Sequence, residues 1–329
     1  MDLINNSSDY QFKYLTLGTY PWAFENASNL TTKWTEITAT TSPAYIAAKV
    51  ANERGDCQYL LDGPDIKVYD ASDNATDTFN TIYQGCKMLA SKLVDAGLNP
   101  KYVANISPYG LYRCYTYSDS NKSDKVNLPG SFGYLMSLAR SIRTNPNYLA
   151  IAGVTRGLVP NLLGLSEKAV SYGKLTNKIA NTVQPQDDYS INCITDVRPY
   201  GLTIWGNRTL ADNKTTEGLT ASSFLNLRNL IYDVKKKLYT SAKSLMFEQN
   251  SDILWVRFKS MITPLLDSMK YGQGIKDYKL TKIESKTRGK LQAEITLYPI
   301  YAVEEFDITV VLTDDDVTVE WWRIYKWLD

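Results

Sequence analysis

Residues that could carry catalysis or bind a metal are few in this sequence, and histidine is missing altogether. The chain of 329 residues contains no His. Its absence excludes Ser-His-Asp and Cys-His catalysis and histidine-ligated zinc within this chain. No two of the four cysteines have Cys-x-x-Cys spacing, so zinc-ribbon and thioredoxin-type sites are excluded too. We expect four reduced thiols, mostly buried, with Cys193 the most accessible to solvent; the four are Cys57, Cys86, Cys114 and Cys193.

Partial matches to catalytic and ion-binding motifs fail on their missing partners. Gly173-Lys174 lacks the upstream glycine and the following Ser or Thr of a phosphate-binding loop. The run from Ser171 to Lys174 fits Ser-x-x-Lys but has no Lys-Thr-Gly partner. The carboxylates of Asp187-Asp188 and of Asp314 to Asp316 lack the spacing of a calcium loop. We therefore predict no catalytic residue, no cofactor and no metal site, and a protein that is not an enzyme.

Composition favours a globular protein that works through protein contacts. Lys and Arg total 36 against 35 Asp and Glu, a net charge of +1, and neither half of the chain is strongly basic. We thus expect no nucleic-acid partner. No apolar run is long enough to span a bilayer, and the first residues do not form a signal peptide, so no membrane insertion is expected. The 24 Tyr and 7 Trp suit surfaces that become buried in partners, or the core of a β-rich fold.

Strands and helices alternate through the first part of the chain. Residues 1–34 read as an entry segment, part extended and part loop. Apolar runs and helical spacing then predict a helix over 36–50, a strand over 57–64, a helix over 75–97 with Gly97 as its cap, a strand over 101–107, a helix over 132–142 and a strand over 148–154. This alternation implies parallel strand pairing, and hence an α/β domain over 35–195.

From residue 196 the pattern changes to paired helices followed by strands. After a short strand at 202–206, amphipathic helices are predicted over 222–245 and 251–270; Pro264 is expected to bend or break the second, and Asn250 or Ser251 to cap it. Period-two alternation then predicts strands over 278–283, 291–297, 306–312 and 317–323. The fold class expected is therefore α/β plus α+β. The C-terminal domain, 196–329, has two helices packed on an antiparallel or mixed sheet and ends in a β-arm.

One ordered set of motifs is specific. Trp-Gly-x-Arg-Thr-Leu at 205–210 is followed by Asn-x-Arg in a helix at 226–228, by Phe-Glu-x-Asn at 247–250, and by Leu-Trp at 254–255. This order resembles the C-terminal domain of contractile-tail sheath proteins of myovirus phages and related injection systems, over about 196–312. Weaker similarities lie in 60–64 and 127–131, and 1–54 match no part of the pattern. The family has a second Arg where this chain has Asn229.

The resemblance implies a structural, mechanical protein. Sheath subunits form hexameric rings that stack into a helical sleeve around an inner tail tube protein, and contraction drives the tube into a host cell. The implied partners are copies of this chain, the tube protein, and the baseplate and tail terminator proteins. The implied location is the virion tail, assembled in the host cytoplasm and serving phage genome ejection. In the family, terminal arms add strands to neighbouring subunits' sheets. We therefore expect a subunit-linking strand containing Val317, Val319, Trp321 and Trp322.

The motif residues have structural roles in this interpretation. Trp205 is expected to be an apolar anchor, Gly206 to allow a tight bend, and Arg208 to pair with Glu248. The other motif residues given a structural role are Thr209, Arg228, Asn250 and Trp255.

Several alternatives stay open at the level of the sequence. Two other classes are a nucleotide- or sugar-handling α/β enzyme and an aromatic-rich glycan-binding surface protein. Within the sheath class, a phage tail, a bacteriocin and a secretion-system sheath share these motifs. The family's usual long N-terminal region is not evident here, which is expected either of a fragment or of an unusual N-terminus.

Overall fold

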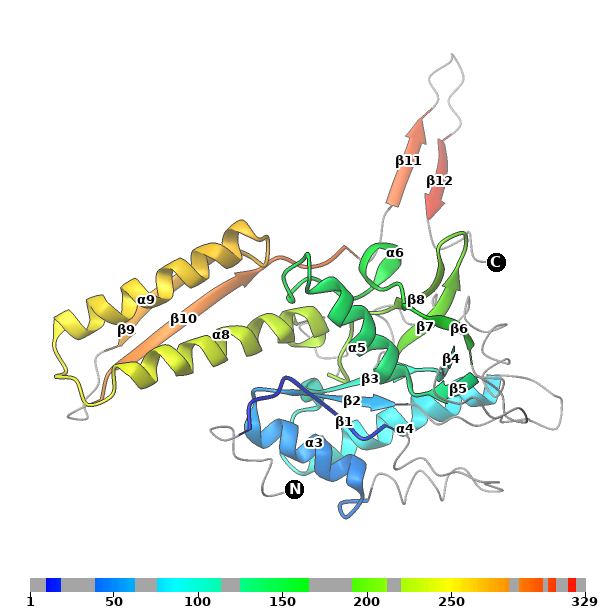
Figure 1. Ribbon diagram of the computed structural model, residues 1–329, viewed down its shortest axis with the longest axis horizontal. Helices are drawn as coiled ribbons and strands as arrows, with labels where there is room; N and C mark the ends of the chain where they lie inside the picture. Colours follow the sequence, from blue (N-terminus) through cyan, green and yellow to red (C-terminus); the bar gives the residue numbers. More distant parts are fainter. Residues whose placement is uncertain are drawn as a thin grey trace.

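A five-stranded, mostly parallel sheet forms the centre of the molecule (Figure 1). The computed structural model describes residues 10–18, 39–62, 76–113, 125–165, 191–211, 220–283, 290–303, 307–311 and 319–323. The sheet has the strand order β1-β2-β3-β7-β8, with β1 at Tyr14–Thr16, β2 at Gln58–Asp62, β3 at Val103–Ser107, β7 at Ile191–Val197 and β8 at Gly201–Trp205. The first four strands are parallel, as the alternation predicted, and β8 is antiparallel to β7.

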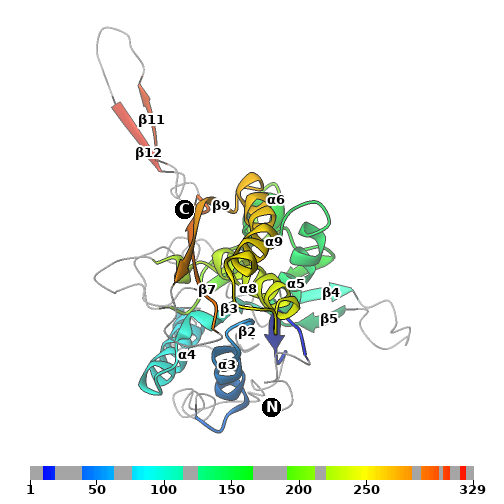
Figure 2. The same ribbon diagram turned by 90° about the vertical axis from the view of Figure 1, so that its left-hand side faces the viewer.

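Helices cover both faces of this sheet (Figures 1 and 2). On one face lie α3 (Pro43–Arg54) and α4 (Thr76–Asp95), packed against side chains such as Tyr59 and Ile191. On the other lie α5 (Gly130–Ser141) and the start of α8, packed against Leu60 and Ile194. Alternate strand residues therefore enter two separate apolar layers, as expected for a sheet buried on both sides. The chain described up to residue 211 thus forms a three-layer α/β body.

Local signals place the ends of several helices. Ser42 caps α3 by accepting a hydrogen bond from the Tyr45 N–H at 3.2 Å. Gly97 follows α4 with φ of +72°, and the Leu98 N–H donates to the Leu93 carbonyl at 2.8 Å, the closing bond of a left-handed cap. The Gly97 cap was predicted and is confirmed. A helix was predicted over 36–50 from Pro43 and the apolar residues after it; α3 instead begins at Pro43 and continues to Arg54, and its Ser42 cap was not predicted.

The strand predicted over 148–154 is wrong. Residues 148–152 form an irregular segment of one turn and two bends, and Gly153, with φ of +75°, opens the short helix α6 (Gly153–Arg156). The place beside β3 is taken by β7 instead. The run is apolar because Tyr148 and Ile151 are buried beneath the elements that follow, since burial alone does not distinguish a strand from a turn.

A second correction concerns Cys193, which was expected to be the most accessible thiol. It lies on β7 inside the sheet and is 0% exposed. Cys57 and Cys86 are buried too, as predicted, and burial raises the pKa of all three thiols. Cys114 lies outside the described residues.

A small antiparallel sheet closes one end of the body. Its order is β5-β4-β6, with β4 at Gly110–Arg113, β5 at Lys125–Leu128 and β6 at Leu162–Leu165. Short 3-10 helices at Pro100–Tyr102 and Ala221–Ser223 precede β3 and α8.

Two long helices and two strands extend from the body as an arm (Figure 1). The arm consists of α8 (Leu225–Ser244), α9 (Asp252–Tyr271), β9 (Ile275–Ile283) and β10 (Gln292–Pro299), as the two amphipathic helices and alternating strands predicted. Helix α9 begins at a Ser251 cap and continues through Pro264 without a break. Strands β9 and β10 pair antiparallel, and their inner face packs on both helices through Tyr278, Leu280, Ile295 and Leu297.

The last two described strands form a separate hairpin rather than part of the arm's sheet. Strand β11 (Asp307–Val311) pairs antiparallel with β12 (Val319–Arg323), placing Thr309 opposite Trp321 and Ile308 opposite Trp322. Both views show this hairpin projecting away from the body (Figures 1 and 2). Val319, Trp321 and Trp322 of the expected linking strand lie in β12, whereas Val317 lies outside the described residues.

The fold class expected from the sequence, α/β followed by helices on an antiparallel sheet, is the one observed. The proposed domain boundary after residue 195 falls within β7, which pairs along its length with β8. The α/β sheet therefore continues to Trp205. No helix among the described residues is long and apolar enough to cross a membrane, and those residues hold no cluster of three metal-ligating side chains.

Candidate assembly site

The turn after β8 joins the body to the arm. From Asn207 to Leu210 the chain crosses back over the end of the sheet, where the Leu210 N–H donates to the Val103 carbonyl at 2.8 Å. The Thr209 hydroxyl donates to the Ser222 carbonyl at 3.0 Å, and the Thr209 N–H to the Ser223 carbonyl at 2.9 Å. The Trp-Gly-x-Arg-Thr-Leu motif thus fixes the segment that leads into α8.

A buried asparagine of the sheet holds this turn by its backbone. The Asn192 side chain, on β7, accepts from the Arg208 N–H at 2.7 Å and donates to the Arg208 carbonyl at 2.8 Å. Its amide also donates to the Asn105 carbonyl on β3, at 2.8 Å. Gly206 passes so close that a Cβ there would lie 2.8 Å from the Cα and Oδ1 of Asn192. Glycine is therefore required at this position for close packing, rather than only for a bend.

A second asparagine caps α8 from a distance. Phe224, at the N-cap, has no capping side chain. Asn207 supplies it, because its Oδ1 accepts from the Asn226 N–H at 3.1 Å and its amide donates to the Asn226 Oδ1 at 2.7 Å. The Asn226 amide in turn donates to the Tyr148 carbonyl at 3.3 Å. The start of the arm is therefore bound to the turn and to the 148–152 segment together.

Two arginines of the motif are buried at this joint. Arg208 is 2% exposed, and its guanidinium carbon lies 4.3 Å from the centre of the Phe224 ring. Arg228, on the first turns of α8, is 3% exposed and lies between the rings of Tyr102 and Tyr232, 4.5 and 4.9 Å from their centres. Such cation–π contacts partly compensate for the loss of hydration.

A chain of hydrogen bonds continues from Arg228 into the sheet. Its guanidinium donates to the Tyr232 hydroxyl at 3.1 Å, and that hydroxyl donates to the Gln58 side-chain oxygen on β2 at 2.7 Å. Burial raises the pKa of Tyr232, so the hydroxyl keeps its proton as a donor. The first half of α8 is thereby attached to the body through polar groups. Asn229, in place of the family's second arginine, is also buried here.

The motif residues separate into two groups about 30 Å apart, the length of the 20-residue α8. Trp205, Gly206, Arg208, Thr209 and Arg228 lie at the joint, with Trp205 half-buried rather than fully buried. The remaining three lie at the tip of the arm, around the turn between α8 and α9.

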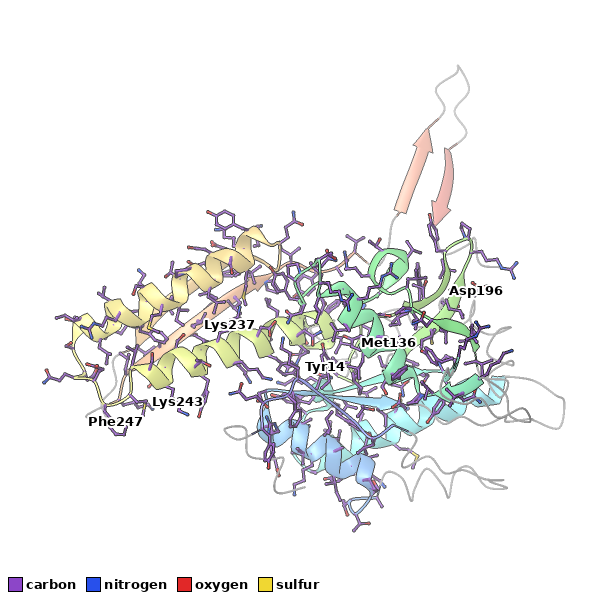
Figure 3. All side chains as sticks on the ribbon, viewed as in Figure 1. Tyr14, Met136, Asp196, Lys237, Lys243 and Phe247 are labelled. Carbon is purple, nitrogen blue, oxygen red and sulfur yellow. The ribbon has the colours of Figure 1, made fainter. Side chains whose placement is uncertain are left out.

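The expected pairing of Arg208 with Glu248 is therefore wrong. The Glu248 carboxylate lies 3.9 Å from the Arg257 guanidinium instead. Asn250 is exposed beside the Ser251 cap, and the Trp255 ring stacks on Phe258 with 5.9 Å between ring centres. Phe247, labelled in Figure 3 at the tip, is fully exposed.

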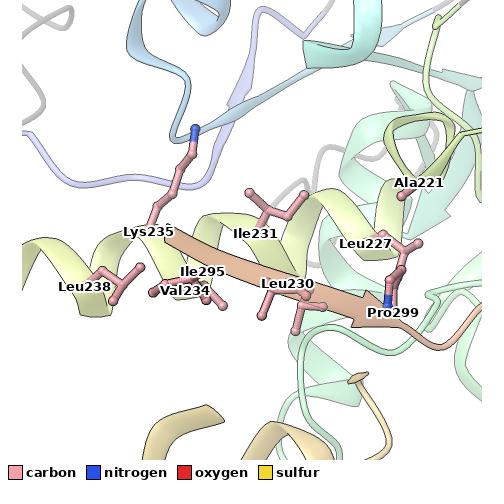
Figure 4. Close-up of a pocket in the computed structure, with 10 residues that line it drawn as sticks. Ala221, Leu227, Leu230, Ile231, Val234, Lys235, Leu238, Ile295 and Pro299 are labelled. Atoms are coloured by element: carbon pink, nitrogen blue, oxygen red, sulfur yellow. The ribbon is translucent and has the colours of Figure 1, made fainter. Parts of the chain in front are cut away.

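The arm carries an apolar groove between α8 and β10 (Figure 4). Its volume is about 370 Å³, and Lys235 is the single charged residue among those that line it. The lining apolar residues include Leu227, Ile231 and Leu238 of α8 and Ile295, Leu297 and Pro299 of β10. Among the described strands, β10 pairs with β9 alone, so its other edge borders this groove without a strand partner. An open strand edge beside an apolar groove can accept another strand.

In α/β enzymes, ligands bind at the carboxyl ends of the strands, and among the described residues the carboxyl ends of β2 and β3 are covered. Asp62, at the carboxyl end of β2, accepts from the Ser131 N–H at 2.6 Å, from the Ser131 hydroxyl at 2.8 Å and from the Thr16 hydroxyl at 3.2 Å. A Cβ on Gly130 would lie 2.6 Å from the Ile106 carbonyl oxygen. The N-terminus of α5 therefore packs directly onto the ends of β2 and β3, where a bound nucleotide would otherwise lie.

Solved structures with the same fold come from contractile machines. A chain of the sheath complex of an extracellular contractile injection system, PVC, in the contracted state has a TM-score of 0.55 and 17% identity over 84% of this chain and 69% of that one. A chain of the anti-feeding prophage baseplate in the contracted state has a TM-score of 0.59 and 18% identity over 87% of this chain and 69% of that one. A chain of the anti-feeding prophage helical sheath in the contracted state has a TM-score of 0.51 and 14% identity over 83% of this chain and 66% of that one. No protein-family model and no curated protein matches the sequence.

The fold is thus that of chains from contractile sheaths and baseplates, and the resemblance drawn from the motifs is confirmed at this level. Sequence reasoning missed Tyr148, Asn192, Asn207 and Tyr232, all buried at the joint; it had Asn226 in the Asn-x-Arg motif but not its contact with Asn207. The available signal was an asparagine in an otherwise apolar strand, Ile191-Asn192-Cys193-Ile194, because a buried amide needs partners.

Proposed function

We propose that this protein is the sheath subunit of a contractile injection apparatus, a structural protein rather than an enzyme. Subunits assemble as stacked hexameric rings around an inner tube, and they bind a baseplate and a terminator at the two ends. Contraction moves the bodies as rigid units into a second lattice and drives the tube into the target cell. A phage tail, where contraction would serve genome ejection, is one form of this apparatus, and a bacteriocin and a secretion-system sheath share the same sequence motifs.

The observation that carries this proposal is the open edge of β10 beside the apolar groove on α8. A strand placed there would gain main-chain hydrogen bonds from β10 and cover Ile231 and Leu238 of α8. The proposed occupant is the C-terminal segment of a neighbouring copy, the β-arm with Val317, Val319, Trp321 and Trp322. Its two described strands, β11 and β12, pair only with each other, and an isolated two-stranded hairpin is marginally stable by itself.

Charge supports the same pairing. Residues 304–329 contain eight acidic and two basic residues, whereas residues 225–303 contain fourteen basic and seven acidic ones. The segment and the arm therefore have opposite net charge, within a chain that is almost neutral overall. Opposite charges steer association and fix register, and salt weakens them.

Truncation and a groove substitution test the proposal. In the complete protein, removal of the residues after Leu312 is expected to leave the fold intact but abolish tube formation seen by electron microscopy. Ile231→Glu should do the same, because it places a carboxylate in the groove that the acidic segment enters. The matched control is Val94→Glu, an exposed valine on α4 of the body, which should still form tubes. Normal tubes from the truncated protein would contradict the arm hypothesis.

No observation favours an enzyme or a glycan-binding protein over this function. The strand ends that would hold a nucleotide are covered by Gly130 and Ser131.

A further inference from the structure

The N-terminal residues 10–16 lie across the place where α8 leaves the body. Strand β1 is an edge strand of three residues, all half-buried, and it pairs only with β2. Figure 3 labels Tyr14 of this strand near that point on α8. An edge strand with so few ladder bonds can detach more readily than the strands inside the sheet.

This segment is bound to α8 through two side chains that lie one turn apart. Lys13 forms an ion pair with Asp233. The Lys236 ammonium donates to the Phe12 carbonyl at 2.8 Å, and burial lowers the pKa of this lysine. Beyond Lys236 the helix makes its contacts within the arm, through residues such as Leu238 and Leu245. Between Asp233 and Lys236, the Lys235 ammonium donates to the Gly55 carbonyl at the end of α3, at 2.8 Å, so the two bonds act beside one direct contact between α8 and the body.

The other side of the segment is bound to the body. The Arg54 guanidinium, at the end of α3, donates to the Tyr10 carbonyl at 2.8 Å and lies 4.2 Å from the centre of the Phe12 ring. The Gln58 N–H donates to the Lys13 carbonyl at 2.8 Å. Seven residues thus link α3 and β2, which are neighbours in the chain, to α8, which is distant from both in sequence.

We infer that residues 10–16 form a strap that, together with the Lys235–Gly55 hydrogen bond, sets the angle between the arm and the body, and that withdrawal of β1 leaves the arm free to change this angle within the reach of the Lys235 side chain. The first half of α8 stays attached through Asn226 and Arg228, so release changes the arm's direction without unfolding it. Within the proposed sheath, on which this consequence rests, a pull on the N-terminal side of one subunit would turn the arm that holds its neighbour.

The lever can be sized from the helix. From Leu230, where α8 is buried, to Lys243 the helix rises about 20 Å, so a rotation of about 15° moves position 243 by about 5 Å. A displacement of this size is measurable as a distance between two spin labels. Lys243 on the arm and Arg140 on α5 are both exposed and suit such labels, introduced as non-canonical residues so that the native cysteines stay unmodified.

The experiment compares label distances by pulsed electron resonance in the monomeric protein. The parent should give one narrow distribution, whereas Lys13→Glu and Lys236→Met should each broaden it or shift it by about 5 Å. Lys49→Glu, which removes the Lys49–Glu53 ion pair on α3, is the matched control and should change nothing. Combining Lys13→Glu with Asp233→Lys should restore the narrow distribution.

Unchanged distributions in both Lys13→Glu and Lys236→Met would overturn the strap. Broadening that the exchanged pair does not reverse would also overturn it, because it would point to general loosening rather than to the lost contact. Neither result depends on assembly, so the sheath proposal would remain to be decided by tube formation.

Discussion

The buried carboxyl of Asp62 predicts an unusual dependence of stability on pH. Burial raises the pKa of Asp62 from 3.8 to about 7, although the hydrogen bonds from Ser131 and Thr16 lower it. The folded protein therefore binds this proton more tightly than the unfolded chain does. A group of this kind stabilises the fold below pH 4, and its contribution is lost as the pH rises to 7. The perturbation that isolates the effect is Asp62→Asn, which retains an acceptor oxygen and removes the titration.

The magnitude follows from the shift. A rise from 3.8 to about 7 is roughly three pKa units, and each unit corresponds to about 1.4 kcal/mol. The free energy of unfolding of the parent, relative to that of Asp62→Asn, should therefore fall by up to about 4 kcal/mol between pH 4 and pH 8. Taking the difference between the two proteins cancels the titration of all the other groups.

Urea denaturation at pH 4.5, 6 and 8, followed by tryptophan fluorescence, measures this difference. Asp196→Asn provides the control, because that side chain is half-exposed beside Arg198 and its effect should stay below about 1 kcal/mol. If the difference between parent and Asp62→Asn is constant with pH, burial does not dominate at this site. If the parent gains stability as the pH rises, the three hydrogen bonds outweigh burial and the reasoning is refuted.

Three further predictions concern the joint and the thiols. Gly206→Ala should lower the free energy of unfolding, measured by urea denaturation, by about 1–3 kcal/mol, because the added Cβ would lie 2.8 Å from Asn192. Gly164→Ala, which adds a Cβ in open space, should leave the free energy of unfolding nearly unchanged, and equal effects of the two substitutions would contradict the close-packing account. Trp205→Ala should cost less than the roughly 3–5 kcal/mol typical of a fully buried aromatic residue, because the side chain is only half-buried; a loss in that full range would place Trp205 in the core. Before unfolding, a thiol reagent should modify none of the buried cysteines Cys57, Cys86 and Cys193. Burial raises the pKa of Cys57 to about 11 and that of Cys86 to about 12, and mass spectrometry of labelled peptides will identify any exception.

Sequence signals were sufficient where one local interaction determines an element. Gly97 and Ser251 each mark a helix end by a cap that depends on neighbouring residues. The period-two alternation of 291–297 predicted β10 because one face of that strand is covered by the arm's helices. These elements need no knowledge of distant parts of the chain.

Sequence signals failed where tertiary contacts decide. The apolar run at 148–154 is buried without being a strand, and Cys193 is inaccessible because β7 occupies the middle of the sheet. The cap of α8 comes from Asn207, and the cap of α5 from Asp62, 69 residues away from Ser131. Contacts between residues so far apart in sequence produce no repeating pattern of residue types. The motif could therefore be recognised from the sequence, but the contacts that its residues make could not.

Cryo-electron microscopy of the complete protein, purified at micromolar concentration and low salt, tests the central claim most directly. We expect tubes or stacked rings with six-fold symmetry, in which density for the segment after Leu312 of one subunit lies against β10 and α8 of the next. Raising the salt should weaken assembly, because the basic arm and the acidic segment attract each other. A protein that stays monomeric under all these conditions, or that assembles with the α8–β10 groove empty, would contradict the account.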